Sequence, residues 1–406
     1  MKKSLVALAA MAVVGGASAQ FSIDGLVDAG VQGINWKGNS ITGVYNNGMA
    51  TSVLNFRGKE DLGGGNQVEF RMATDWNPVS NYANTGKAQA AAVSYVPGNG
   101  WLTDEVWVAA RNGAGEIKFG AVNNNNLVTY SAIGQPFGTA VGSFYRAGFA
   151  SDAAQAMNGA LPRFDNSLQY TSPTMSGFKA AVLVVKKVGN AATGNFTHNP
   201  GQYDRNGITD VGLYYNNGPL NAGYASMKED NIGVAATTVT GISITGTTAG
   251  TLTYANTDGT LTFRTNTLGA NYALGDLTLY VLNQRRSNSG VTTSAGNVAN
   301  TSATTISAKY QMGANAFLIQ TGSVTNKNEL NAATVQYTGG PAVTAKSAML
   351  GLGYQYDLSK TTKAYLHYEK LDDTAGIIPA YSATTQFATT SSATRTRTAA
   401  GIKMNF

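Results

Sequence analysis

The sequence of 406 residues contains no cysteine and only two histidines. The lack of cysteine excludes disulfide scaffolds, thiolate metal sites and cysteine nucleophiles. His198 and His367 lie far apart in the sequence, so we expect no multi-histidine metal site, and a Ser-His-Asp triad would have to use one of the two. The sequence therefore predicts no cofactor, no metal site and no enzyme.

Charged residues and long apolar runs are also scarce. Charged residues make up 12% of the chain, the formal net charge is +6, and no Lys/Arg cluster stands out that would indicate nucleic-acid binding. Beyond the first residues, no apolar stretch approaches the ~20 residues of a membrane-spanning helix. If this chain sits in a membrane, a closed β-barrel is the remaining way to span it, because lipid cannot satisfy free backbone N–H and C=O groups.

The first nineteen residues have the pattern of a secretory signal. Lys2 and Lys3 form a basic start, an apolar stretch runs from Leu5 to Gly16, and Ala17-Ser18-Ala19 forms a small-residue cleavage site. We expect residues 1–19 to be removed and residues 20–406 to form one domain, since no linker or shift of composition divides them.

Short segments of strict alternation recur along the rest of the chain. The final one places Ala400, Ile402, Met404 and Phe406 on one face and polar residues on the other. Tight Gly-rich turns alternate with long polar connections, as expected for hairpins with one short and one long side. With an opening strand from Phe21, the pattern predicts an all-β chain folded as a transmembrane antiparallel β-barrel of about sixteen strands.

A secreted soluble β-protein, such as a lectin or an adhesin, would also alternate. The face opposite the apolar one favours the barrel, because a sandwich core cannot hold so many charges. The charged residues that we assign to this face are Arg57, Glu69, Arg71, Glu105, Arg111, Lys118, Lys179, Lys309, Lys363, Glu369, Arg395, Arg397 and Lys403. Basic residues outnumber acidic ones among them. One strand, around Ala316 to Gln320, stays ambiguous because both of its faces carry apolar residues.

Three motifs resemble the general trimeric porins of β-proteobacteria. The run FRGKEDLGGG at 56–65 resembles the G-x-E-D-L-G-G-G turn of that family, and RFDNSLQYTSP at 163–173 resembles its R-x-D-N-S-x-x-Y-x-S-P segment. The closing GIKMNF at 401–406 resembles the last strand of these porins. The resemblance implies a homotrimer in the outer membrane of a Gram-negative bacterium, in contact with lipid and lipopolysaccharide. It also implies that Phe406 is part of the signal read by the barrel-insertion machinery.

The resemblance further implies a water-filled channel for ions and small hydrophilic solutes, with the third outer loop folded into the pore. The matching stretch lies between Gly120 and Arg163 and is rich in aromatic residues. An outer-membrane enzyme of the phospholipase or protease kind is the weaker alternative, because no nucleophile motif accompanies either histidine. Val53 stands where the family commonly has a lumen-facing arginine, which indicates a rearranged basic cluster.

Two alternatives are open for the charges of the lumen. Unpaired arginines near the loop would make the pore weakly anion-preferring. Arginines paired with Glu69, Glu105 and Asp152 would only brace the wall. The residues that we expect near the constriction are Arg71, Arg111, Arg146, Arg163, Asp152, Glu69, Glu105, Arg395 and Arg397.

Overall fold

A computed structural model of the chain describes eleven stretches of the sequence. They are residues 20–36, 39–79, 102–143, 163–186, 207–232, 238–242, 250–253, 261–289, 301–326, 345–373 and 393–406. The predicted signal, residues 1–19, lies outside them.

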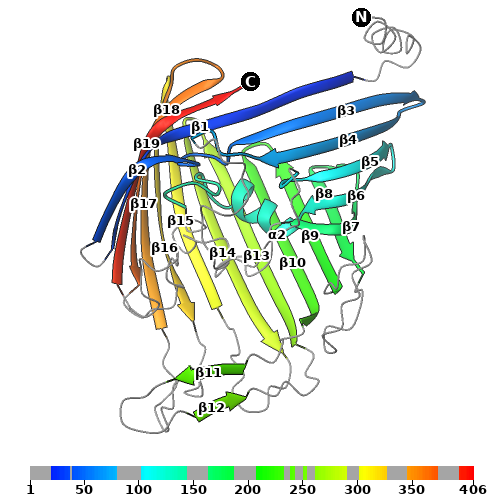
Figure 1. Ribbon diagram of the computed structural model, residues 1–406. Helices are drawn as coiled ribbons and strands as arrows, with labels where there is room; N and C mark the ends of the chain where they lie inside the picture. Colours follow the sequence, from blue (N-terminus) through cyan, green and yellow to red (C-terminus); the bar gives the residue numbers. More distant parts are fainter. Residues whose placement is uncertain are drawn as a thin grey trace, which may run out of the picture.

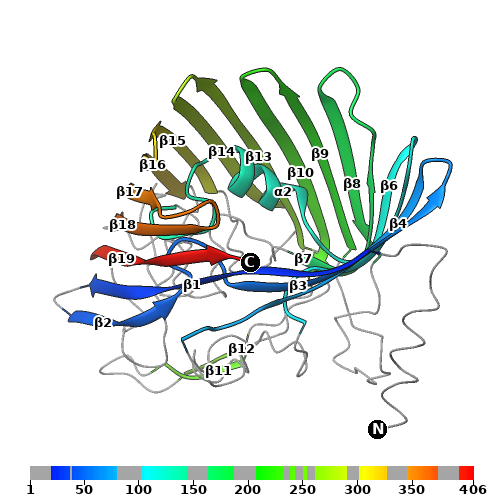
Figure 2. The ribbon, with the colours of Figure 1, turned by 90° about the horizontal axis from the view of Figure 1, so that it is seen from above.

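The strands form one closed antiparallel wall (Figures 1 and 2). In chain order they are β1 (Gln20–Trp36), β2 (Asn39–Asn46), β3 (Val53–Gly63), β4 (Asn66–Asp75), β5 (Val106–Asn112), β6 (Gly115–Asn123), β7 (Arg163–Thr171), β8 (Phe178–Val185), β9 (Gly207–Asn217), β10 (Leu220–Ile232), β13 (Leu261–Leu274), β14 (Leu277–Ser289), β15 (Thr301–Met312), β16 (Asn315–Asn326), β17 (Ala345–Asp357), β18 (Thr362–Asp373) and β19 (Ala393–Asn405). Two further strands, β11 (Thr238–Ile242) and β12 (Gly250–Thr253), pair only with each other.

The wall contains sixteen strands, because β2 and β3 together take the place of one. The second half of β1 pairs with β2 and its first half pairs with β3, so that the two short strands follow one another along β1. The predicted all-β barrel is thus confirmed. Among the described residues, no helix is long and apolar enough to cross a membrane.

Tight turns join the strands at one end of the barrel. Between β3 and β4, Gly63, Gly64 and Gly65 all have positive φ, at +80°, +61° and +81°. Only glycine adopts three such conformations in a row without strain. The positive φ angles therefore explain why the motif at 56–65 ends in three glycines.

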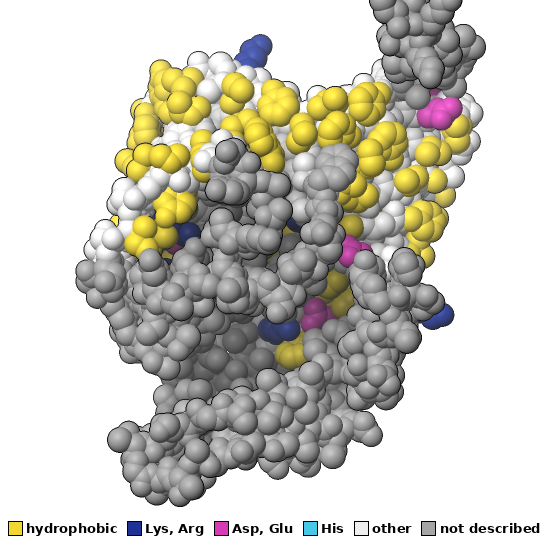
Figure 3. Space-filling view, in the orientation of Figure 1, with side chains coloured by type: hydrophobic (Ala, Val, Ile, Leu, Met, Phe, Trp, Pro, Cys, Tyr) yellow, Lys and Arg dark blue, Asp and Glu magenta, His cyan; other side chains and the backbone are white. Residues whose placement is uncertain are grey.

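The outer face of the wall is apolar. Ile306, Leu268 and Ile402 are among many large apolar side chains that are more than half exposed in the isolated chain, and hydrophobic side chains cover the described part of the wall in Figure 3. The strand that was ambiguous in the sequence follows the same rule: Phe317 and Ile319 are exposed on the outside, whereas Leu318 is buried on the inside. Such a band is what a barrel presents to lipid.

The ring closes where β1 pairs with β19. At the end of this seam the backbones of Gly25 and Phe406 exchange two N–H···O bonds of 3.0 Å. A Cβ at Gly25 would lie 2.9 Å from the ring of Phe406 and even closer to the carbonyl oxygen of Val53. Glycine at this position lets three chain segments meet at the seam.

The break between β2 and β3 is held by Asp28 on the inner face of β1. Its carboxylate accepts hydrogen bonds from the backbone N–H groups of Met49 and Ala50 and from the hydroxyl of Tyr365, 2.6 Å away on β18. Asp28 is fully buried. Met49 and Ala50 lie between β2 and β3, where the ladder of backbone hydrogen bonds with β1 is interrupted. The carboxylate of Asp28 accepts the two N–H groups that this interruption leaves without a backbone acceptor.

Replacing Asp28 with alanine should destabilise the barrel, because several buried donors would lose their acceptor. We expect the free energy of unfolding to fall by about 3 kcal/mol. The temperature at which the folded form converts to the unfolded form on a gel measures this loss. Asp276→Ala, in the exposed turn after β13, is the matched control, and equal transition temperatures for the two variants would contradict the role of Asp28.

Candidate functional site

A segment of the connection between β6 and β7 runs along the inside of the wall. It starts with the short helix α2 (Asn125–Val128), continues as a π-helical turn (Thr129–Ile133), and is described as far as Ser143. Figure 2 shows α2 inside the ring of strands. The side chain of Asn124 caps α2 by accepting the backbone N–H of Leu127 at 2.6 Å. We call residues 124–143 the inner segment.

Asp210 on β9 anchors the start of the inner segment. Its carboxylate accepts the backbone N–H of Asn125 and the side-chain amide of Asn126, the latter at 3.0 Å. Asn126 in turn accepts the hydroxyl of Thr267 on β13 at 2.6 Å. Asp210, Asn126 and Thr267 are fully buried, so this end of the segment is fixed to two strands by polar contacts shielded from water.

Strands on the other side of the barrel hold the far end. The backbone N–H of Gly142 donates to the carboxylate of Glu369 on β18 at 2.9 Å, and the N–H of Val141 donates to the carbonyl of Gly48 at 3.1 Å. In the middle, Gln320 on β16 donates to Gln135 at 2.8 Å. The inner segment therefore follows the inner face of the wall from β9 to β18.

Aromatic and glycine residues fit the inner segment against the wall. The ring of Phe137 meets the ring of His367 edge-on, with centroids 5.4 Å apart. His367 is fully buried in this contact. A Cβ on Gly351 would clash with the carbonyl of Gly142, and one on Gly269 would lie 2.9 Å from the carbonyl oxygen of Thr129. These wall glycines let the backbone of the segment approach the strands.

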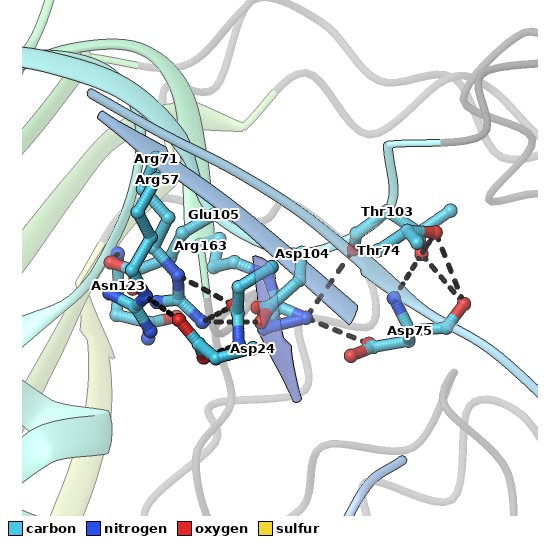
Figure 4. Close-up of polar contacts among 11 residues, drawn as sticks. Asp24, Arg57, Arg71, Thr74, Asp75, Thr103, Asp104, Glu105, Asn123 and Arg163 are labelled. Atoms are coloured by element: carbon cyan, nitrogen blue, oxygen red, sulfur yellow. Dashed lines mark hydrogen bonds and ion pairs between the residues drawn. The ribbon is translucent and has the colours of Figure 1, made fainter. Parts of the chain in front are cut away.

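Arg71 on β4 belongs to a charged cluster on the inner face of the wall (Figure 4). Its guanidinium forms ion pairs with Glu105 and, at 3.2 Å, with Asp104. It also donates two hydrogen bonds to the side-chain oxygen of Asn55, at 3.0 and 2.8 Å. Glu105 additionally accepts the backbone N–H of Asn123 at 3.1 Å, one residue before the inner segment.

Arg163 extends the same cluster. Its guanidinium pairs with Asp104 at 3.0 Å and with Asp75 at 3.1 Å. Arg71 and Arg163 thus share Asp104 between them. The sequence pattern had suggested Arg71, Arg163 and Glu105 but neither Asp75 nor Asp104, because both of these acids stand at strand ends where alternation gives no clear face.

Arg111 lies elsewhere, near the tight turn between β5 and β6. It pairs with Glu116 and, at 3.6 Å, with Glu69. Glu116 also accepts Lys118 at 3.0 Å. The structure therefore does not bring Arg111 together with Arg71 and Arg163, although all three were expected near the constriction.

Arg395 and Arg397 lie on the inner face of β19. Arg397 pairs with Glu369 at 2.9 Å, so that one carboxylate joins this arginine to the end of the inner segment. Arg395 is buried on the same face. Arg146 and Asp152 lie outside the described residues. Within the described stretches, no group of three or more His, Asp or Glu side chains is arranged to hold a metal ion.

The comparisons with known proteins agree with this architecture. A sequence profile described as Gram-negative porin matches residues 4–376. The chain belongs to this family. Membership, together with the β-barrel, confirms the resemblance seen in the motifs and the location of the protein in the outer membrane.

Individual relatives are more distant. The chain is 31% identical over 244 residues to outer membrane porin protein 32 of Delftia acidovorans, a match that covers 56% of this chain and 60% of the relative. It is 29% identical over 251 residues to an outer membrane porin protein of Bordetella pertussis, covering 54% of this chain and 58% of the relative. The matched stretches thus span less than two thirds of either relative.

Solved structures match over nearly the whole chain. An anion-selective porin from Comamonas acidovorans superposes with a TM-score of 0.68 at 20% identity, covering 96% of this chain and 100% of that one. OmpT of Vibrio cholerae in its trimer form gives a TM-score of 0.60 at 10% identity, covering 96% of this chain and 99% of the other. At these identities the likeness shows the fold.

Replacing Asp210 with alanine should loosen the start of the inner segment. Each lost bond to a charged acceptor costs about 1.5–3 kcal/mol, so the anchored form loses most of its advantage over released forms. We expect larger fluctuations of the open-channel current in planar bilayers. Asp230→Ala is the control, since Asp230 on β10 pairs with Lys228 rather than with the segment. Open-channel currents of Asp210→Ala that fluctuate no more than those of the unmutated channel would contradict the role of Asp210 as an anchor of the inner segment.

Proposed function

We propose that the protein is a passive diffusion channel for ions and small hydrophilic solutes, with a weak preference for anions. The observation that carries the proposal is the closed wall, apolar outside and charged inside, with the inner segment lying along its inner face. No covalent step is involved. Solutes pass through water, and the side chains that line the narrowest level replace part of their hydration.

The inner segment supplies the narrowing. Its two ends are tied to opposite sides of the wall by the carboxylates of Asp210 and Glu369. The arginine cluster lies beside the start of the segment, through Glu105 and the backbone of Asn123. We propose that Arg71, Arg163, Glu105, Arg395 and Arg397 act on ions at this level. Arg111 and Glu69 act nearer the tight turns.

The anion preference is supported by the matched structure, which is described as an anion-selective porin. The pairing of Arg71 with Asp104 and Glu105 explains why the preference should be weak. A paired arginine still offsets two carboxylates that would otherwise attract cations into the same water-filled space.

A salt gradient of KCl across a planar bilayer tests the preference. We expect a reversal potential of anion sign for the unmutated channel. Arg71→Ala should reduce the anion-to-cation permeability ratio roughly twofold to threefold, because Asp104 and Glu105 lose their counter-charge. Arg71→Lys is the control and should keep most of the preference. A clear cation preference of the unmutated channel would overturn this part of the proposal.

We also propose that three copies assemble in the membrane, in contact with lipid and lipopolysaccharide, after the export signal 1–19 has been removed. Phe406 at the end of the β1–β19 seam is the proposed signal for the insertion machinery. Its ring lies on the outer face and is about half exposed, where it takes no part in the lumen. No enzymatic activity is proposed.

Gel electrophoresis with and without boiling tests the assembly. The unboiled protein should migrate as a trimer in mild detergent and shift to the monomer position after boiling, because heat separates the subunits and unfolds the barrel together. Chemical cross-linking before boiling should preserve a band of three times the monomer mass. A protein that runs only as a folded monomer before boiling would contradict the trimer.

A further inference from the structure

We propose that Lys228, Arg264 and Arg285 form a binding site for the phosphate groups of lipopolysaccharide on the outer surface of the wall. The inference rests on the proposed contact with lipopolysaccharide and names the residues that make it. Lys228 lies on β10, Arg264 on β13 and Arg285 on β14, three strands that follow one another in the sheet (Figure 1). We call these three residues the outer basic patch.

The side chains of the outer basic patch point away from the lumen. Tyr224 on β10, Leu268 on β13 and Val281 on β14 are exposed on the outer face. Each of them lies four residues from the basic residue of its own strand. Residues an even number apart share a face of a strand. The inner face of the same strands, next to the patch, carries buried residues instead: Met227, Thr265 and Gln284.

Strand register brings the three cations together. Lys228 and Arg264 are direct partners across the β10–β13 ladder. Arg285 is the partner of Asn266, which places it diagonally opposite Arg264 on the same face. Direct partners have Cβ atoms about 5 Å apart and diagonal neighbours lie about 7–8 Å apart, so one polyvalent anion can reach all three side chains.

One carboxylate accompanies the outer basic patch. Asp230 pairs with Lys228 at 2.8 Å and accepts the hydroxyl of Thr262 at 3.2 Å. Arg264 and Arg285 are exposed, and neither forms an ion pair or a hydrogen bond with any residue that the structure describes. Three cations thus face one carboxylate, and both guanidinium groups have their N–H donors open to a ligand.

The outer basic patch lies at the end of the wall opposite the tight turns. Lys228 is near the end of β10 and Arg264 near the start of β13, beside the long connection 233–260. In outer-membrane barrels the short turns face the periplasm and the long connections face the outside of the cell. The patch therefore faces the outer leaflet of the membrane, which contains lipopolysaccharide, rather than the phospholipids of the inner leaflet.

The outer surface changes from apolar to polar to basic along these strands. Leu268 and Val281 belong to the apolar band, Asn266 and Asn283 follow them, and the two arginines come next. Four residues of a strand span about 13 Å. Lipopolysaccharide has the same order of chemical groups, with acyl chains in the membrane and phosphorylated sugars above them.

Arginine suits a phosphate at this level of the membrane. A guanidinium presents a planar fork of N–H donors that binds a phosphate through two parallel hydrogen bonds. The arginines of the inner cluster use their donors on acids of the same chain, as Arg71 does with Asp104 and Glu105. Arg264 and Arg285 have no such acid in contact among the described residues, so a ligand from outside the chain can supply the negative charge.

Titration with fluorescently labelled lipopolysaccharide tests the site in the full-length protein, folded in a detergent free of lipopolysaccharide. The unmutated protein should bind in a saturable way. Arg264→Gln and Arg285→Gln should each raise the Kd roughly tenfold, because each loses a charge-assisted contact with phosphate. Gel migration without boiling shows whether each variant is folded before it is titrated.

Lys370→Gln is the matched control. Lys370 is exposed near the same end of the wall on β18, and its partners across the neighbouring ladders are Leu350 and Thr396, which carry no charge. Its removal should leave the Kd unchanged. An equal rise of the Kd in the control and in both arginine variants would reveal a general charge effect and overturn the site.

Two lipid controls test the ligand. Dephosphorylated lipopolysaccharide should bind the unmutated protein with a Kd close to that of the arginine variants for the intact lipid. Phosphatidylglycerol should compete poorly. Equal binding of the dephosphorylated lipid, or equal competition by phosphatidylglycerol, would overturn the assignment of the patch to the phosphates of lipopolysaccharide.

The same preparations separate this inference from the proposed function. Saturable binding of lipopolysaccharide with an unchanged Kd in Arg264→Gln and Arg285→Gln would overturn the outer basic patch and leave the contact with lipopolysaccharide standing. No binding by the unmutated protein would overturn both. Arginine-dependent binding by a protein that carries no ion current in planar bilayers would overturn the channel and leave the patch.

Discussion

The fold depends on one constraint: in lipid, every backbone N–H and C=O group needs a partner within the protein. The wall meets it by closing on itself where β1 pairs with β19, and the seam ends in the two backbone hydrogen bonds between Gly25 and Phe406. The interruption between β2 and β3 would leave the backbone N–H groups of Met49 and Ala50 without an acceptor. Asp28 and the hydroxyl of Tyr365 complete the pairing there, so a buried carboxylate contributes to closure as the strands do.

A closed wall of this size encloses more space than its own side chains fill, and the inner segment occupies part of it. Carboxylates fasten the segment at both ends, Asp210 on β9 and Glu369 on β18. Glycines at positions 269 and 351 remove the side chains that would hold its backbone away from the wall. Polar anchoring, close backbone approach and the apolar packing of Phe137 and Val141 on the wall together fix the loop.

The charges of the lumen follow from the same arrangement. Arginines that lie beside the inner segment brace it by pairing with acids, as Arg397 does with Glu369 and Arg71 with Glu105. A guanidinium committed to two carboxylates contributes little net attraction for anions.

The sequence by itself determined the barrel, its strand count and its two faces, because a period of two and glycine-rich turns are local properties. It also placed Arg71, Arg111 and Arg397 on the inner face. Only the tertiary structure decided which charges meet. Asn126 and Asp210 are 84 residues apart, and Gly142 and Glu369 are 227 apart. Alternation tells which way a side chain points, whereas ring closure and strand register bring its partner from a distant strand.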